Sequence, residues 1–264
     1  MDYLHLLILS IVQGLTEFLP VSSSAHLILL PQIAGWKDQG LVYDIAAHMG
    51  SLVAVLFYFR QDISRILFAW IDSLQGNPVT QDARIAWYVL IATIPVALCG
   101  YILYDIVASL FRNPLIIAYA TILFGIVLWW SDIQGKKIRN QEKLRLSDAL
   151  WIGMAQVLAL VPGVSRSGIT MSAGLVLGLD RQTSARVSFL LAVPVIILAG
   201  GHEIYRYVGE GANTDPLAFL MVLVFSAISA WLAIRFFLAL LDRTGMLPYV
   251  IYRIALGMFL LYVY

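Results

Sequence analysis

Long apolar segments are the feature that most constrains how this chain can fold. Each is close to the ~20 residues that a helix needs to cross the hydrocarbon core of a bilayer. The chain has 264 residues, of which 61% are hydrophobic and only 12% charged, more apolar surface than a water-soluble domain of this size buries. We therefore expect a single all-α polytopic membrane domain over residues 1–264. The six predicted transmembrane helices cover residues 43–59, 85–107, 114–131, 186–205, 216–241 and 247–264.

The charge and cysteine content exclude several other classes of protein. The formal net charge of +1 argues against nucleic acid as a partner. The single cysteine, Cys99, excludes a disulfide within the chain. Because no Lys or Arg precedes Lys37, we do not expect a cleavable secretory signal.

Two further apolar segments are interrupted by polar residues and proline. Residues 3–19 end at Pro20 and a serine cluster, and the apolar pattern resumes over 25–35. Residues 148–161 end at the pair Pro162-Gly163, and the pattern resumes over 169–179. A broken backbone at membrane depth is tolerated only where protein or a water-filled cavity covers it. We therefore predict two re-entrant helical hairpins that meet inside the protein.

The two halves of the chain also resemble each other. The stretch QGLTEFLPVSSSAH at 13–26 is similar to QVLALVPGVSRSGIT at 156–170. Each hairpin is followed by three predicted spans, and an odd number of spans makes the second copy enter the membrane from the opposite face. We therefore predict an inverted-topology repeat of approximately 1–132 and 147–264, an arrangement that usually places a polar site near the midplane.

The distribution of basic residues is consistent with this topology. Only Lys37, Arg112 and Arg206 lie on one predicted side. Because cytoplasmic loops are enriched in Lys and Arg, we expect both termini outside the cytoplasm and the 133–147 loop inside. The eleven basic residues on the predicted cytoplasmic side are Arg60, Arg65, Arg84, Lys136, Lys137, Arg139, Lys143, Arg145, Arg181, Arg186 and Arg243.

Polar and ionisable residues inside the predicted hydrophobic zone indicate a functional site. Gln13 and Glu17 are four residues apart and so share one helix face, where their oxygens would suit a divalent cation such as Mg²⁺ or Ca²⁺. The planar guanidinium of Arg166 matches phosphate or carboxylate. The N–H groups that open a half-helix favour an anion. The candidate anion-binding residues are Ser22, Ser24, Gly163, Ser165, Ser167 and Thr170.

Each of these residues also has a structural alternative. Glu17 and Arg166 could form a buried ion pair that holds the two hairpins together, and the serines could only cap helices. Arg253 could extend toward the membrane surface or pair within the bundle. We expect a structural role for His48, which follows Asp44 by four residues.

The two motifs together resemble the signature of the bacterial undecaprenyl-diphosphate phosphatase family, also called the BacA family. Gln13 and Glu17 match its [E/Q]xxxE pattern, with the neutral option at position 13, and the serines and His26 follow. Residues 162–170 match PGxSRSxxT at every fixed position. The resemblance covers essentially the whole chain, and two motifs about 140 residues apart form a specific signal.

The resemblance implies hydrolysis of undecaprenyl diphosphate to undecaprenyl phosphate and inorganic phosphate in the bacterial cytoplasmic (inner) membrane. It also implies recycling of the lipid carrier for peptidoglycan, bacitracin resistance and a divalent cation held by Glu17 and Gln13. We expect the site to open toward the extracytoplasmic side, and a homodimer is an assembly to be tested. Glu17, Ser23, His26 and Arg166 are the predicted catalytic residues; His26, a serine or water is the nucleophile.

A transporter or flippase for polyprenyl phosphates is the alternative from another functional class. Inverted repeats with broken helices are common in carriers. A carrier needs an anion site but no group that transfers protons. The cluster of Glu17, Ser23 and His26 near an arginine therefore favours hydrolysis.

Overall fold

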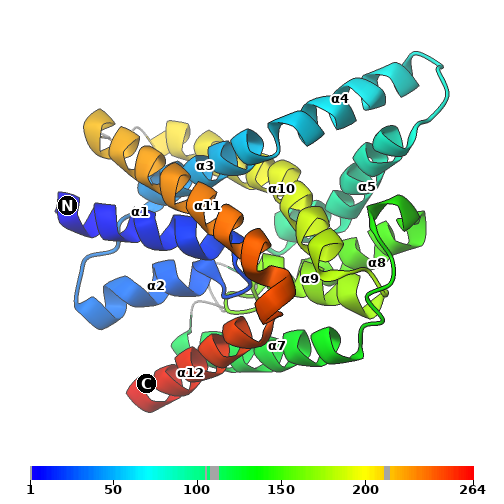
Figure 1. The fold of residues 1–264 in the computed structure, drawn as a ribbon. Coiled ribbons are helices and arrows are strands. Elements are labelled where there is room, and N and C mark those ends of the chain that lie inside the picture. Colours follow the sequence, from blue (N-terminus) through cyan, green and yellow to red (C-terminus); the bar gives the residue numbers. More distant parts are fainter. Residues whose placement is uncertain (1, 105, 108–112, 211–214) are drawn as a thin grey trace.

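The computed structural model describes residues 2–104, 106, 107, 113–210 and 215–264, and the regular structure of these residues is helical (Figure 1). The α-helices are α1 Tyr3–Phe18, α2 Ser23–Ala34, α3 Leu41–Tyr58, α4 Arg60–Leu74, α5 Gln81–Ile102, α7 Pro114–Gln134, α8 Leu146–Val157, α9 Arg166–Val176, α10 Arg181–Glu210, α11 Pro216–Thr244 and α12 Leu247–Val263. Two short 3₁₀ helices are η1 Gln141–Lys143 and η2 Leu158–Leu160.

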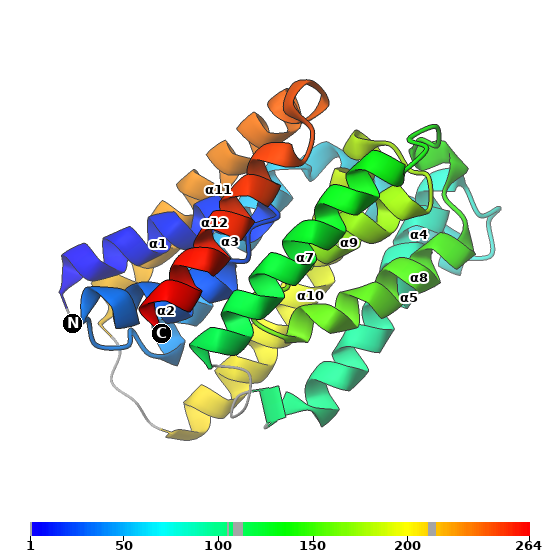
Figure 2. The ribbon, with the colours of Figure 1, turned by 90° about the horizontal axis from the view of Figure 1, so that it is seen from below.

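Five described helices, α3, α5, α7, α10 and α11, are long and apolar enough to cross a membrane. They correspond to five of the six predicted spans, and the chain is therefore a polytopic helical membrane protein. The sixth predicted segment forms α12, which has 17 residues. In Figure 2, α12 lies side by side with α7, and the two helices pack together.

Both interrupted segments form pairs of short helices. The helix α1 ends at Phe18, and α2 begins at Ser23 and packs against α1. In the second pair, α8 continues as η2 to Leu160, and α9 begins at Arg166 and packs against α8. The predicted breaks at Pro20 and Pro162 are thus confirmed as helix interruptions. Arg112, one of the three basic residues on the other predicted side, lies outside the described residues.

The sequence interpretation left out α4, which follows α3 after a turn at Phe59. Charged residues lower the hydropathy of this segment, but Ile63, Ile66 and Trp70 recur at helical spacing. The Trp70 ring packs edge-on against Trp87 of α5, with the ring centroids 5.9 Å apart. The amphipathic pattern therefore makes α4 a helix that covers α5.

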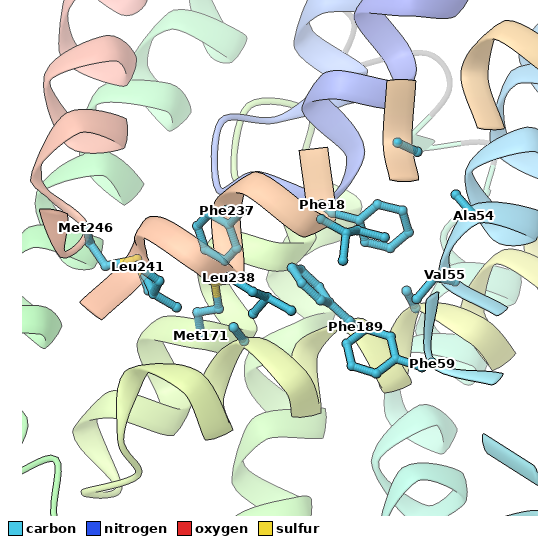
Figure 3. Close-up of a cluster of buried hydrophobic side chains, with 14 of the residues drawn as sticks. Phe18, Ala54, Val55, Phe59, Met171, Phe189, Phe237, Leu238, Leu241 and Met246 are labelled. Atoms are coloured by element: carbon cyan, nitrogen blue, oxygen red, sulfur yellow. The ribbon is translucent and has the colours of Figure 1, made fainter. Parts of the chain in front are cut away.

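A cluster of phenylalanines joins both halves of the chain in the core (Figure 3). Phe189 of α10 packs edge-on against Phe18 of α1 at a centroid distance of 5.2 Å. The same ring lies 5.8 Å from Phe237 of α11 and 6.2 Å from Phe59. Phe18 is the last residue of α1, so this cluster fixes the point at which the first hairpin breaks.

Glycines bring α1 and α3 into backbone contact with α11. A Cβ added at Gly14 of α1 would lie 2.0 Å from Ser229 Oγ, and one at Gly50 of α3 would lie 2.2 Å from the Leu223 carbonyl oxygen. Helices in membranes often pack through such small residues, because the backbones can then approach closely. Any larger side chain at either position would push α11 away.

Several basic residues predicted to lie on the cytoplasmic side form ion pairs with aspartates at one end of the helices. Arg65 Nε lies 2.8 Å from an Asp82 oxygen, and Arg181 Nε lies 2.7 Å from Asp132 Oδ1. Residues from α4, α5, η1 and the start of α10 line one polar cavity there. Both chain termini lie at the opposite end of the helices (Figures 1 and 2).

Candidate functional site

The two helix interruptions meet and are hydrogen-bonded to each other. The Gly163 amide donates to Ser22 Oγ at 3.1 Å, and Ser167 Oγ donates to the Leu19 carbonyl at 2.8 Å. Ser22 and Ser165 each precede the first residue of the following helix, and both have φ of 72°. Few residues other than glycine adopt positive φ, and those that do cluster at functional sites.

Arg253 of α12 joins both interruptions from behind. Its side chain is fully buried and donates from Nη1 to the Pro20 carbonyl at 3.2 Å and from Nη2 to the Gly163 carbonyl at 2.8 Å. Its Nε donates to the Thr121 carbonyl at 3.1 Å. Of the two predicted alternatives, Arg253 therefore pairs within the bundle, and these three partners are backbone carbonyls.

Glu17 is the point at which the two sequence motifs converge. Arg166 Nη2 donates to Glu17 Oε1 at 3.0 Å, across 149 positions of the chain. Glu17 Oε2 accepts from Ser23 Oγ at 2.6 Å and from Gln13 Nε2 at 2.9 Å. Only 6% of the Glu17 side chain is exposed. The structure thus brings together the carboxylate, the hydroxyl and the guanidinium that the sequence selected.

His48 of α3 also faces this carboxylate, which the sequence interpretation did not anticipate. Its Nε2 lies 3.8 Å from Glu17 Oε2. Its Nδ1 lies 2.8 Å from the Asp44 carbonyl oxygen, which can only accept, so Nδ1 carries a proton. The predicted structural role of His48 agrees with its bond to the Asp44 carbonyl. The sequence did not predict its contact with Glu17.

These residues line one cavity of about 200 Å³. The first residues of α2 and α9, Ser23 and Arg166, both lie on its wall, so the free N–H groups of two helices favour an anion there. The lining consists of polar residues from both interruptions together with residues of α3 and α10: Glu17, Ser22, Ser23, Ser24, His48, Ala159, Ser165, Arg166, Val195, Ile196, Ala199, Gly200 and Glu203.

Three of the predicted anion-binding residues support this cavity from behind. The hydroxyl of Thr170 donates to the Arg166 carbonyl and is hydrogen-bonded to the Ser188 hydroxyl, each at 2.8 Å. Gly163 has φ of 96°, and a Cβ there would lie 2.6 Å from the Ile117 carbonyl oxygen. Ser167 makes the bond between the interruptions given above. These residues position the loops, whereas Ser22, Ser24 and Ser165 line the cavity.

The family of the chain follows from comparison with known proteins. The family model described as "Bacitracin resistance protein BacA" matches residues 6–259. This chain belongs to the BacA family. It is 50% identical over 264 residues to "Undecaprenyl-diphosphatase 2" of Stutzerimonas stutzeri, covering 99% of this chain and 98% of that protein. It is also 49% identical over 264 residues to "Undecaprenyl-diphosphatase" of Nitrosococcus oceani, covering all of both chains.

In this BacA-family chain, His26 does not line the cavity that holds Glu17. Its Nδ1 donates to the Ser22 carbonyl at 2.7 Å, and its Nε2 lies 2.5 Å from the Tyr252 hydroxyl of α12. Because Nδ1 carries the proton, Nε2 accepts from Tyr252 in the neutral ring. Both ring nitrogens are thus occupied in the described conformation, and a catalytic role for His26 stays a prediction.

Few oxygen atoms near Glu17 are available as ligands for a hard cation. Gln13 Oε1 is buried without a hydrogen-bond partner in the described part of the chain, while the amide nitrogen of the same side chain holds Glu17. Amide and carboxylate oxygens are ligands that Mg²⁺ and Ca²⁺ accept. Among the described residues, no group of three or more His, Cys, Asp and Glu is placed to hold a metal ion. A divalent cation at this site stays a prediction, and Glu17 and Gln13 are the residues that would hold it.

Proposed function

We propose that this chain hydrolyses undecaprenyl diphosphate to undecaprenyl phosphate and inorganic phosphate. The observation that carries this proposal is the pairing of Ser23 with Glu17 beside Arg166 in a buried cavity of a polytopic membrane protein. The BacA relatives named as undecaprenyl-diphosphatases support the substrate. The product is the lipid carrier for peptidoglycan, and removal of the diphosphate, which bacitracin sequesters, accounts for resistance.

The diphosphate binds where positive charge and free N–H groups converge. Arg166 presents its guanidinium on the cavity wall, and α2 and α9 begin there. Ser22, Ser24 and Ser165 supply hydroxyl groups beside them. Because only 12% of the Arg166 side chain and 6% of the Glu17 side chain are exposed, charge interactions here are stronger than they would be at an exposed surface.

Ser23 is the group best placed to attack the terminal phosphorus. Its Oγ forms the new bond to phosphorus while its proton passes to Glu17 Oε2, 2.6 Å away. The bond between this phosphorus and the bridging oxygen breaks, and undecaprenyl phosphate leaves. Water then hydrolyses the phosphoserine to inorganic phosphate, and Ser23 Oγ regains the proton from Glu17. Arg166 stabilises the charge on the transferred group in both steps.

A divalent cation is also part of the proposal. Glu17 and Gln13 would hold it through their side-chain oxygens. When bound, such a cation neutralises charge on the diphosphate.

The first test measures phosphate release by the purified protein from undecaprenyl diphosphate labelled in the terminal phosphate. We expect release that a chelator suppresses, and loss of release in Ser23→Ala. A quenched wild-type reaction should carry an acid-stable label on Ser23, because phosphoserine survives acid and phosphohistidine does not. An acid-labile label, or an unchanged rate in Ser23→Ala, would remove Ser23 from the mechanism and return the role to His26 or water.

The flippase alternative has no observation in its favour. A flippase would move polyprenyl phosphate across the membrane of a liposome without releasing phosphate. Finding transport but no release by the purified protein would overturn the hydrolase proposal.

The proposed membrane topology has six spans and two re-entrant hairpins in an inverted repeat over approximately 1–132 and 147–264. The packing supports this: α1 packs against α11 as α8 packs against α5, and α7 pairs with α12 as α3 pairs with α10. The equal φ of Ser22 and Ser165 is what equivalent positions of a repeat would have. Both termini lie at one end of the helices, and the polar cavity lined by Arg65 and Arg186 lies at the other end (Figure 2). This arrangement supports extracytoplasmic termini.

Cysteine labelling tests this orientation. In a Cys99→Ser background, we expect an impermeant thiol reagent to label Asp2→Cys from outside intact bacteria and Asn140→Cys only after the cells are opened. The physical reason is the retention of Lys and Arg on the cytoplasmic side. Labelling of both positions from one side would contradict the inverted repeat. The same proposal places the protein in the cytoplasmic membrane with its site facing outward, and light scattering in detergent tests the homodimer.

A further inference from the structure

A second cavity, of about 390 Å³, lies between α5 and α10, and Leu160 of η2 also lines it. Its walls include Val96 and Ala97 of α5 and Leu198 of α10. Most of the side chains that line it are apolar or aromatic, and the polar or ionisable ones besides the two tyrosines are Thr93, His202 and Glu203. We call this cavity the α5–α10 groove.

The groove borders the cavity that contains Glu17. Val195, Ala199 and Glu203 line both. These residues are four apart along α10, so they form one stripe of that helix at the border between the two spaces. A molecule whose polar head occupies the Glu17 cavity would have the α5–α10 groove on the other side of this stripe.

The outer wall of the groove faces the surroundings of the helices. Leu198 is 53% exposed, and Tyr101, next to Gly100 on α5, is 77% exposed. In a protein of membrane-spanning helices, such apolar exposure is contact with lipid. The groove therefore borders both the polar cavity and the hydrocarbon of the bilayer.

A missing side chain helps to keep the groove open. Gly100 lines it, and a Cβ added there would meet one neighbour, Leu160 Cδ2, at 3.4 Å. That distance is an ordinary van der Waals contact, so a larger residue at position 100 would fill the groove without a backbone clash.

We propose that the α5–α10 groove binds the diphosphate-proximal isoprene units of the substrate tail. This rests on the proposed function, because the polar end of the same molecule must occupy the Glu17 cavity. A space of this size accepts only part of a long polyprenyl chain, so the rest remains in the bilayer. Since lipid is as apolar as the groove, the groove acts by fixing the direction and shape of the tail rather than by removing it from water.

The test uses variants that fill the groove. Gly100→Leu and Ala97→Trp should raise KM for undecaprenyl diphosphate at least about 10-fold, which corresponds to 1.4 kcal/mol of binding. The rate with methyl diphosphate, which has no isoprenoid tail, should stay near that of the wild type. Leu98→Trp is the matched control, because Leu98 is on the same helix, 58% exposed and absent from the groove lining. Unchanged KM in both groove variants would overturn the proposal.

A second measurement does not depend on turnover or on tolerance of the larger side chains. A photoreactive benzoylphenylalanine at position 97 should cross-link to radiolabelled undecaprenyl diphosphate, and excess unlabelled substrate should compete. The same residue at position 94, where Ile94 is 53% exposed, should cross-link much less. Equal cross-linking at both positions, or labelling that substrate does not displace, would show that bilayer lipid fills the groove. Absence of hydrolysis by the wild type would instead overturn the proposed function.

Discussion

Glu17→Gln should leave a folded protein that releases almost no phosphate. The amide has nearly the volume of the carboxylate and can still hydrogen-bond, but it cannot take the proton of Ser23 Oγ, which now lies 2.6 Å from Oε2. Proton transfer by a positioned side chain contributes about 10²–10⁴-fold to a rate, and we expect a loss in that range. Phosphate release per mole of folded protein measures it.

The alternative is that Glu17 serves only as the ion-pair partner of Arg166. Breaking one partner of a buried pair costs roughly 3–5 kcal/mol, so Glu17→Gln and Arg166→Gln would each lower the melting temperature sharply. Arg166 also donates to the Ser188 carbonyl at 3.3 Å and lines the cavity, so we expect smaller losses of stability. Recovery of both melting temperature and activity in the double variant would show that the pair is structural. We expect the double variant to be inactive.

Arg253→Lys should reduce activity well beyond its effect on folding. Lysine keeps the charge but replaces a planar group that spans the carbonyls of Thr121, Pro20 and Gly163 with a single ammonium. Since Pro20 and Gly163 belong to the two interruptions that carry Ser23 and Arg166, their relative position should loosen. A displacement of about 1 Å is sufficient for a loss of about 100-fold in kcat.

The measurement is kcat per mole of folded protein, together with the melting temperature. Arg253→Met should also unfold more easily, because hydrogen bonds to charged groups contribute about 1.5–3 kcal/mol each. Arg181→Met is the control: Arg181 donates two hydrogen bonds to Asp132 at the far end of the helices, away from both interruptions. It should lower the melting temperature while kcat per folded molecule stays unchanged. An equal effect of the two arginines on kcat would contradict the role of Arg253.

The sequence was sufficient to predict the features that depend on local chemistry. Pro20 and Pro162 interrupt apolar segments that would otherwise continue, and the structure breaks both helices there. The repeat predicted that the two interruptions meet, so the contact between Glu17 and Arg166 could be inferred although the residues are far apart in the chain. Single-sequence hydropathy was less informative for the segment of α4, where charges on one face conceal an apolar face.

Features that depend on the packing of whole helices could not be predicted. His48 reaches Glu17 only because α3 packs against α1, whereas along the sequence its nearest ionisable neighbour is Asp44. The role of Arg253 was hidden for a related reason. Its partners are main-chain carbonyls on separate elements, and a carbonyl group leaves no signal in the residue types.

The close backbone contact of Gly14 and Gly50 with α11 has a consequence for the order of biogenesis. During synthesis, α1 emerges from the ribosome long before α11, which ends only at Thr244. Until then, the surfaces around Gly14 and Gly50 have no α11 to meet, and Arg253 has not yet been made. The first hairpin therefore remains without its α11 and Arg253 contacts until nearly the whole chain has been translated. The hydrogen bonds from Arg253 that join the two interruptions are therefore among the last contacts to form in the assembly of the protein.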